Sequence, residues 1–270
     1  MSEVNIIGAG LAGSEAAWQL AERDIKVNLY EMRPTATTQA HKTANFAELV
    51  CSNSFRSDEK LTNAVGILHE ELRIANSLIM HAADVHQVPA GSALAVDRNL
   101  FSDEVTQKIK GHKNIRIFNS EVESIPDDWE YVIIATGPLT SEKLSSFILK
   151  KNSQDSLYFF DAIAPIIYTE TIDMSKAWFQ SRYNKIGPTG SKNDYINCPL
   201  TEEQYNIFIN DLIDAEKNSF NDWEKDTPYF DSCLPIEIMA LSGPQTLRHG
   251  PMKPFGLKIG RAVQQECRDR

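Results

Sequence analysis

One stretch near the start of the chain decides the fold: Val4-Asn5-Ile6-Ile7-Gly8-Ala9-Gly10-Leu11-Ala12-Gly13-Ser14-Glu15-Ala16-Ala17. Its apolar start predicts a buried strand, and the residues after the glycines predict a helix. Gly8 allows a tight turn, Gly10 lets the backbone approach a diphosphate, and Gly13 lets the helix lie close to the strand. Because a helix N-terminus attracts anions, this turn predicts a dinucleotide site. The alternative is a glycine turn that holds no ligand.

The next predicted strand, over residues 26–31, ends in a carboxylate, Glu31. A carboxylate at this place accepts hydrogen bonds from the ribose hydroxyls of a dinucleotide and repels a 2′-phosphate. We therefore expect a nucleotide of the ADP-ribose type and not NADP. A later apolar run, Tyr131-Val132-Ile133-Ile134, leads into Ala135-Thr136-Gly137. This end resembles the second fingerprint of two-domain FAD and NAD flavoproteins, which makes FAD the expected dinucleotide.

The composition is that of a globular protein of one large or two ordinary domains. The chain has 270 residues, of which 42% are hydrophobic and 24% charged. No apolar run approaches the roughly 20 residues of a membrane helix, so we expect a cytoplasmic protein. The four cysteines are scattered and indicate neither a metal site nor a disulfide framework. The net charge of −10 argues against non-specific nucleic-acid binding by the whole surface.

The order of predicted elements indicates an α/β fold. We expect a Rossmann-like, FAD-binding half-domain over residues 1–165, with a smaller inserted α+β domain over 166–257. Within the first, apolar spacing predicts one long helix over 62–83 and a strand over 114–119 with an antiparallel companion over 121–125. Within the second, Thr201 and Gln204 form a predicted capping box at the start of a helix.

Several polar residues are candidates for a site, and each has two interpretations. Cys51 and Cys233 each lie where an apolar run meets a polar turn, and each is either a buried packing thiol or a nucleophile. Asp97 and Arg98 end an apolar segment and form either a surface ion pair or a substrate contact. The Gly/Pro-rich segment 243–257 is either a linker or a loop that holds an anion or an RNA backbone.

These motifs together resemble one family, the folate- and FAD-dependent tRNA (uracil-5-)-methyltransferases. The resemblance covers residues 1 to about 257 and rests on the glycine turn together with the following segments: Glu31-Met-Arg-Pro, Phe46-Ala-Glu-Leu-Val-Cys-Ser-Asn-Ser, Val88-Pro-Ala-Gly, Ala93-Leu-Ala-Val-Asp-Arg, Ala135-Thr-Gly-Pro-Leu-Thr, Cys233-Leu-Pro-Ile-Glu and Gly250-Pro-Met-Lys-Pro.

The resemblance implies methyl transfer to C5 of a uridine, in tRNA as is usual in the family, or in ribosomal RNA. It implies 5,10-methylenetetrahydrofolate as carbon donor, reduced FAD as relay and reductant, NAD(P)H as the source of electrons, and no metal. Cys51 and Cys233 are the implied catalytic thiols, in either order of roles. The implied cofactor-binding residues are Gly8, Gly10, Gly13, Glu31, Arg33, Ala135, Thr136 and Gly137. The implied substrate-binding residues are Asp97, Arg98, Arg248 and Lys253.

The last residues, 258–270, do not resemble the continuation of that family, whose members run on to complete the flavin domain. The expectation is therefore a C-terminally truncated chain with weak or absent FAD retention. Two other functions stay open on the sequence: an FAD-dependent oxidoreductase acting on a small substrate, and an inactive fragment that at most binds nucleotide or RNA. The motifs do not determine the oligomeric state.

Overall fold

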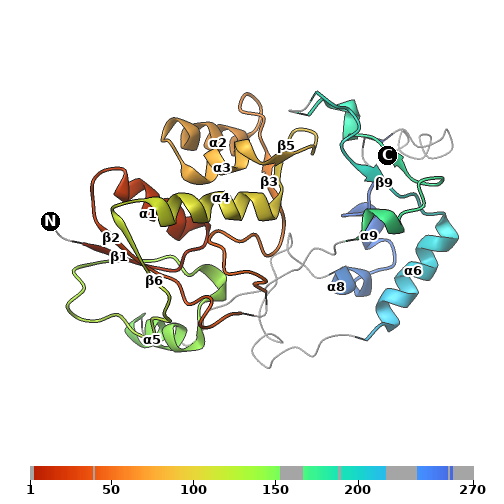
Figure 1. The fold of residues 1–270 in the computed structure, drawn as a ribbon. Helices are drawn as coiled ribbons and strands as arrows, with labels where there is room; N and C mark the ends of the chain where they lie inside the picture. Colours follow the sequence, from red (N-terminus) through yellow and green to blue (C-terminus); the bar gives the residue numbers. More distant parts are fainter. Residues whose placement is uncertain are drawn as a thin grey trace. The chain divides into compact units, whose positions relative to one another are not determined.

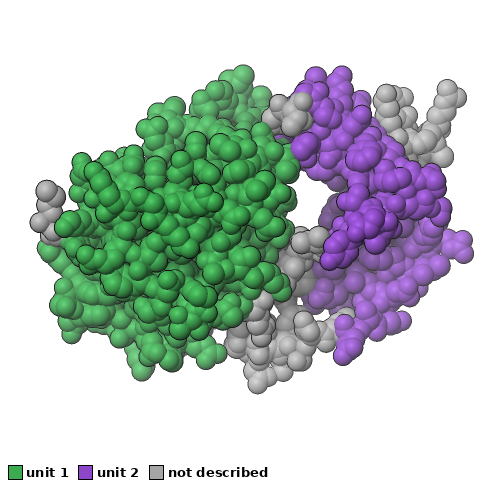
Figure 2. Space-filling model, in the orientation of Figure 1, with its two compact units in different colours: residues 1–88, 93–163 green, residues 89–92, 164–270 purple. Residues whose placement is uncertain are grey.

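The computed structural model describes residues 3–38, 40–152, 167–187, 190–216, 236–254 and 256–257. The chain divides into two compact units (Figure 2). Unit 1 comprises residues 1–88 and 93–163, and unit 2 comprises residues 89–92 and 164–270. The chain therefore passes between the units at 88–89, 92–93 and 163–164.

A parallel sheet of four strands, in the order β6-β2-β1-β7, is the centre of unit 1 (Figure 1). Its strands are β1 (Val4–Ile7), β2 (Val27–Tyr30), β6 (Ile115–Phe118) and β7 (Tyr131–Ile134). In the register, Ile7 pairs with both Tyr30 and Ile134. The turns that follow these strands therefore meet at one edge of the sheet, as in Rossmann-like folds. The predicted α/β class is confirmed.

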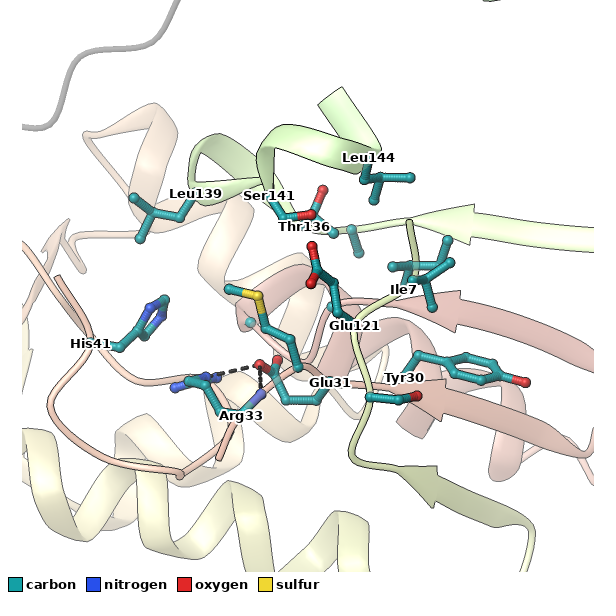
Figure 3. A pocket seen from close by; sticks show the side chains of 16 residues that line it. Ile7, Tyr30, Glu31, Arg33, His41, Glu121, Thr136, Leu139, Ser141 and Leu144 are labelled. Carbon is teal, nitrogen blue, oxygen red and sulfur yellow. Dashed lines mark hydrogen bonds and ion pairs between the residues drawn. The ribbon is translucent and has the colours of Figure 1, made fainter. Parts of the chain in front are cut away.

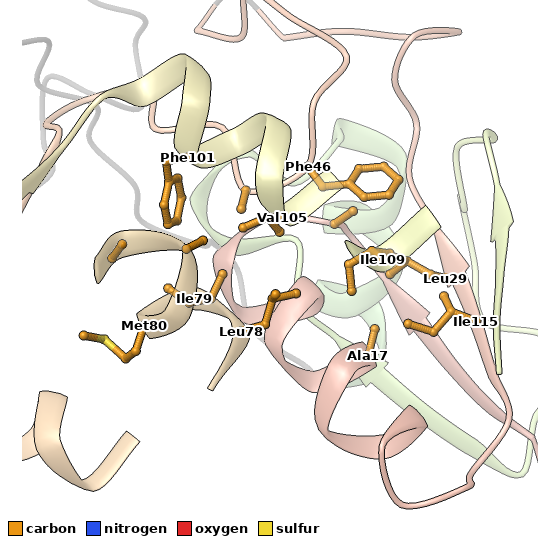
Figure 4. Packing of buried hydrophobic residues seen from close by; sticks show 14 of the residues in the cluster. Ala17, Leu29, Phe46, Leu78, Ile79, Met80, Phe101, Val105, Ile109 and Ile115 are labelled. Atoms are coloured by element: carbon orange, nitrogen blue, oxygen red, sulfur yellow. The ribbon is translucent and has the colours of Figure 1, made fainter. Parts of the chain in front are cut away.

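The helices of unit 1 pack on the sheet and on one another. They are α1 (Leu11–Ala21), α2 (Ala64–Ile74), α3 (Leu78–Val85), α4 (Arg98–Gly111), α5 (Glu142–Asn152) and the short 3-10 turn η1 (Gly137–Leu139). Helix α1 contacts β1 and β2, α4 contacts β6, and α3 contacts both α1 and α4. Figure 4 shows the resulting core, in which Phe101, Val105 and Ile109 of α4 are fully buried.

The single helix predicted over 62–83 is wrong, because the structure has two helices there. Asn76 adopts a left-handed conformation with φ of 55°, and Ser77 then caps α3 by accepting a hydrogen bond from Met80 N at 3.1 Å. Glu15 of α1 fixes the break: its Oε2 accepts bonds from Ser77 Oγ at 2.8 Å and Ile79 N at 3.0 Å. The apolar period alone does not reveal this tertiary contact.

The antiparallel companion strand predicted over 121–125 is also wrong, since these residues are irregular in the structure. β6 pairs instead with β2, in parallel. A separate antiparallel sheet, in the order β3-β5-β4, lies in unit 1. Its strands are β3 (Ser54–Ser57), β4 (Gln87–Val88) and β5 (Ala93–Val96).

Unit 2 has a smaller core around one helix, α6 (Glu202–Asp214). The predicted capping box is confirmed: Gln204 N donates to Thr201 Oγ1 at 3.2 Å, and Thr201 N donates to Gln204 Oε1 at 2.9 Å. The other described elements are η2 (Thr169–Thr171), β8 (Trp178–Phe179), η3 (Arg182–Asn184), β9 (Ile196–Asn197), α8 (Ile236–Leu241) and α9 (Thr246–His249).

The tip of the β4–β5 hairpin belongs to unit 2, although its strands belong to unit 1. Gly91, with φ of 62°, donates its N–H to Asp194 Oδ2 at 2.6 Å. Next to it, Tyr195 donates its hydroxyl to Ala90 O at 2.5 Å. These two bonds hold residues 89–92 to the second unit.

Within the described ranges, no helix is long and apolar enough to cross a membrane.

Phe101→Ala should destabilise unit 1 by about 3–5 kcal/mol, because it removes a fully buried ring and leaves a cavity in the core. Leu100→Ala is the matched control, since the Leu100 side chain is 52% exposed. Urea unfolding followed by circular dichroism measures both. A Phe101→Ala midpoint equal to that of the control would contradict this packing.

Candidate dinucleotide-binding site

Two of the three glycines of the β1–α1 turn are required for steric reasons. Gly8 has φ of 95°, and a Cβ on it would lie 2.8 Å from the carbonyl oxygen of Ala135. A Cβ on Gly13 would collide with the carbonyl oxygen of Gly8, so only glycine lets α1 approach the strand this closely. A Cβ on Gly10, by contrast, would meet nothing within 4 Å. Gly10 therefore borders open space rather than packed protein.

Helix α1 begins at Leu11 without a capping side chain. The first N–H groups of a helix have no acceptor within the helix, and together with the helix dipole they favour an anion. Gly10 precedes these groups and also lines a pocket. The turn thus presents backbone donors next to space that a ligand can enter.

Glu31 follows β2 and reaches back to this turn. Its Oε2 accepts the N–H of Ala9 at 2.9 Å, while its Oε1 accepts the backbone N–H of Arg33 at 3.1 Å and the guanidinium Nε at 2.9 Å. Both side chains are almost fully buried. Burial by itself raises the pKa of the Glu31 carboxyl, but the hydrogen bond and charge of Arg33 outweigh it and hold that pKa below its ordinary value of 4.5.

Arg33 continues this network into the loop that follows. Its Nη1 lies 3.1 Å from Glu48 Oε2 and donates to Thr43 O at 3.4 Å. Glu48 in turn accepts the backbone N–H groups of Lys42 at 2.8 Å and Thr43 at 3.2 Å. The Arg33 guanidinium is therefore paired with two carboxylates, and the loop over 42–48 is folded around the second of them.

The Ala135-Thr136-Gly137 segment follows β7, directly beside the glycine turn. Ala135 N donates to Ile7 O at 2.8 Å, and Gly137 has φ of 59°. The hydroxyls of Thr136 and Thr140 are 2.6 Å apart, and Thr140 Oγ1 also donates to Gly137 O at 2.7 Å. Space is open where a Cβ of Gly137 would lie.

These segments line one pocket, shown in Figure 3. The space inside it is about 540 Å³, open solvent at the mouth included. Ten of its lining residues were not anticipated as site residues: Ile7, Tyr30, Met32, His41, Ser120, Glu121, Val122, Leu139, Ser141 and Leu144. Glu121 comes from the segment after β6, the neighbour of β2. The antiparallel hairpin expected between residues 114–119 and 121–125 gives no reason to place Glu121 at the pocket. Parallel pairing of β6 with β2 brings the segment after β6 to the same edge of the sheet as Glu31.

Cys51 lies outside this pocket, at an exposed position before β3. Of the two interpretations of Cys51, the buried packing thiol is therefore wrong. Asp97 and Arg98 do not form the ion pair that was one of their two interpretations: Asp97 caps α4, accepting the N–H groups of Asn99 and Leu100 at 3.0 Å. Arg98 instead donates to Cys51 O at 2.8 Å and to Leu49 O at 3.4 Å.

The remaining candidates lie in unit 2 or outside the described residues. Cys233 falls outside them. Arg248 belongs to α9, and Lys253 follows shortly after. The buried Tyr205 of α6 holds this segment, because its hydroxyl donates to Pro244 O at 2.8 Å and accepts the N–H of Arg248 at 3.1 Å.

Within the described ranges, no group of three His, Cys, Asp or Glu residues could hold a metal ion.

A parallel sheet, an uncapped helix N-terminus after a glycine turn, and a buried carboxylate at the end of the next strand together define an α/β protein of the dinucleotide-binding class. Comparison with known proteins narrows the class. The family described as Glucose inhibited division protein A matches residues 3–267, and the chain belongs to this family.

Curated relatives carry more specific names. The chain is 60% identical over 94% of its length to a protein of Rhodopseudomonas palustris named methylenetetrahydrofolate–tRNA-(uracil-5-)-methyltransferase. It is 61% identical over 95% of its length to a protein of the same name from Nitrobacter hamburgensis. It spans about half the length of these relatives, 53% and 54%. The similarity to a solved structure of Aquifex aeolicus GidA covers 46% of this chain and 20% of the GidA chain, with 18% sequence identity and a TM-score of 0.37.

The Glu31 carboxyl should make unit 1 sensitive to acid. Because its pKa is lowered in the folded chain, its stabilising contribution is complete above the unfolded value and disappears as the pH falls below about 4.5. Glu31→Gln should therefore lower the midpoint of thermal unfolding at pH 7. Between pH 5 and pH 3, that midpoint should decrease less in the variant than in the unsubstituted chain. Asp127→Asn, at an exposed carboxylate, is the control. Equal pH profiles for Glu31→Gln and the control would contradict the assignment.

Proposed function

We propose that this chain carries the nucleotide-binding and nucleophile-bearing part of a folate- and FAD-dependent tRNA (uracil-5-)-methyltransferase. The observation that carries the proposal is the convergence of Gly10, the start of α1 and Glu31 in one pocket. The names of relatives about 60% identical to the chain support the specific reaction. A cytoplasmic location fits an RNA acceptor.

The pocket suits the ADP part of FAD. The diphosphate would lie against Gly10 and the first N–H groups of α1, where no side chain intervenes. A carboxylate can accept about four hydrogen bonds. The described bonds to Glu31 come from Ala9 and Arg33, so its Oε2 keeps capacity for a ribose hydroxyl. Arg33 is already paired with Glu31 and Glu48, so its charge is neutralised by two carboxylates rather than offered to a 2′-phosphate.

The strand order then gives the direction of the dinucleotide. With the diphosphate at the end of β1 and the ribose at the end of β2, the base would extend toward the end of β6, where Ser120, Glu121 and Val122 line the pocket. The other half of the cofactor would pass Ala135-Thr136-Gly137, after β7. The open space at Gly137 suits such a close passage.

Bound FAD would supply electrons and relay the one-carbon unit that 5,10-methylenetetrahydrofolate provides, with NAD(P)H restoring the reduced form. The protein must supply the nucleophile, because C5 of uracil is unreactive until a thiolate adds to C6 and pushes electrons onto the ring carbonyl. We assign this addition to Cys51, whose position is exposed. A base must later remove the C5 proton, and Cys233 is the candidate. The acceptor is tRNA, with ribosomal RNA as the alternative acceptor.

Gly10→Ala should weaken the binding of ADP and FAD by about tenfold or more, close to 1.4 kcal/mol, because a methyl group would occupy the approach of the diphosphate. The fold should be unaffected, since that methyl meets nothing within 4 Å. Gly111→Ala is the matched control: its Cβ is equally unobstructed, and Gly111 ends α4 outside the pocket. Isothermal titration with ADP and with FAD measures both variants. Unchanged affinity in Gly10→Ala, or no ADP binding by the unsubstituted chain, would contradict the nucleotide site.

Cys51→Ala should abolish the covalent adduct between the chain and a 5-fluorouridine-containing tRNA, formed with folate, FAD and NAD(P)H supplied and detected on a denaturing gel. Cys198→Ala, at another exposed cysteine, should leave the adduct unchanged. An adduct formed by Cys51→Ala would refute the assigned nucleophile. Without an adduct from the unsubstituted chain, the proposal that this chain bears the nucleophile would fail.

A further inference from the structure

The short segment that carries Cys51 is anchored on both sides. Leu49, before it, is buried in the core of unit 1. Asn53, after it, is bonded to Val96 in both directions: Val96 N donates to Asn53 O at 3.0 Å, and Asn53 Nδ2 donates to Val96 O at 2.8 Å. The residues between these anchors, 50–52, have no regular secondary structure of their own.

Arg98 ties this segment to α4. Its Nη2 donates to Cys51 O at 2.8 Å and its Nη1 to Leu49 O at 3.4 Å, so one guanidinium bridges two carbonyl oxygens of the segment. The backbone of Arg98 is itself fixed, since Arg98 is the first residue of α4 and the preceding Asp97 caps that helix. The bridge therefore runs from a rigid helix start to the backbone of the cysteine.

We infer that Arg98 is a positioning residue for Cys51, rather than a residue that contacts the RNA directly. The inference rests on the proposed function for the identity of the nucleophile. A planar guanidinium can bond two carbonyl oxygens at once, and the two N–H groups used in this way point at the backbone of the segment. Holding the carbonyl of Cys51 limits the directions in which its side chain can approach C6 of a uracil. The bridge thus lowers the entropic cost of reaching the attacking geometry.

Arg98→Lys distinguishes the effect of the bridge from the effect of the charge. An ammonium keeps the positive charge but lacks the planar fork that spans two carbonyl oxygens. Arg98→Ala removes both. If the bridge is what matters, the two variants should behave alike. Arg116→Ala, at an exposed arginine of β6, is the control for loss of one positive charge.

The structural readout is hydrogen exchange, followed by mass spectrometry of peptides covering 49–55 and 93–97. Both Arg98 variants should exchange faster at Ser54 N, bonded to Ser52 Oγ, and at Val96 N, bonded to Asn53 O, while the core helices exchange as before. Unchanged exchange in these peptides would overturn the inference. This measurement requires neither RNA nor cofactor, so it decides the role of Arg98 even if the methyltransferase proposal fails.

The functional readout is the rate of adduct formation with 5-fluorouridine tRNA, together with the affinity for that tRNA at several salt concentrations. Both variants should form the adduct on the order of 10- to 100-fold more slowly at saturating tRNA, with affinity and its salt dependence equal to those of Arg116→Ala. If Arg98 binds a phosphate instead, Arg98→Lys should retain most activity, and the salt slope of Arg98→Ala should fall by about one relative to the unsubstituted chain. Either of these results would overturn the positioning role.

Discussion

The hydrogen bond from Ala9 N to Glu31 joins the two halves of the β1–α1–β2 unit. It connects the turn after β1 with the end of β2 at 2.9 Å, and the Glu31 side chain that accepts it is almost fully buried. A buried carboxylate is tolerated only when it is paired and hydrogen-bonded, and Arg33 meets that requirement. Since Arg33 also binds Glu48, the same charge balance determines the path of the loop over 42–48. The pocket wall on this side is thus one connected polar network.

Local sequence was sufficient for those parts of the site that depend on local geometry. The positions of Gly8 and Gly13 could be predicted because a tight turn and a close helix–strand contact leave no room for a Cβ. Glu31 could be predicted because the carboxyl ends of parallel strands share an edge. The bonds of Glu31 with Arg33 were not predicted, although the two residues are neighbours along the chain.

The rest depended on contacts between distant segments. The break between α2 and α3 is set by Glu15 of α1, so the apolar spacing of residues 62–83 gave no sign of it. Glu121 enters the pocket because β6 pairs with β2, a pairing that cannot be deduced from β6 alone. Similarly, the exposure of Cys51 and its tie to Arg98 depend on where α4 begins relative to β3. Residue types suggested these positions, but the pairing of elements decided their surroundings.

The hairpin tip at residues 89–92 couples the evolution of the two units. Gly91 belongs to unit 2 but lies along the chain between two strands of unit 1; its N–H bonds Asp194, and a Cβ on it would lie 3.3 Å from the ring of Tyr195. A gene fragment encoding only residues 164–270 would therefore leave Asp194 without that partner. Recombination could not exchange unit 2 between relatives as one uninterrupted cassette, because four of its residues are encoded far upstream. Compensating substitutions are accordingly expected in pairs, one near position 91 and one near 194.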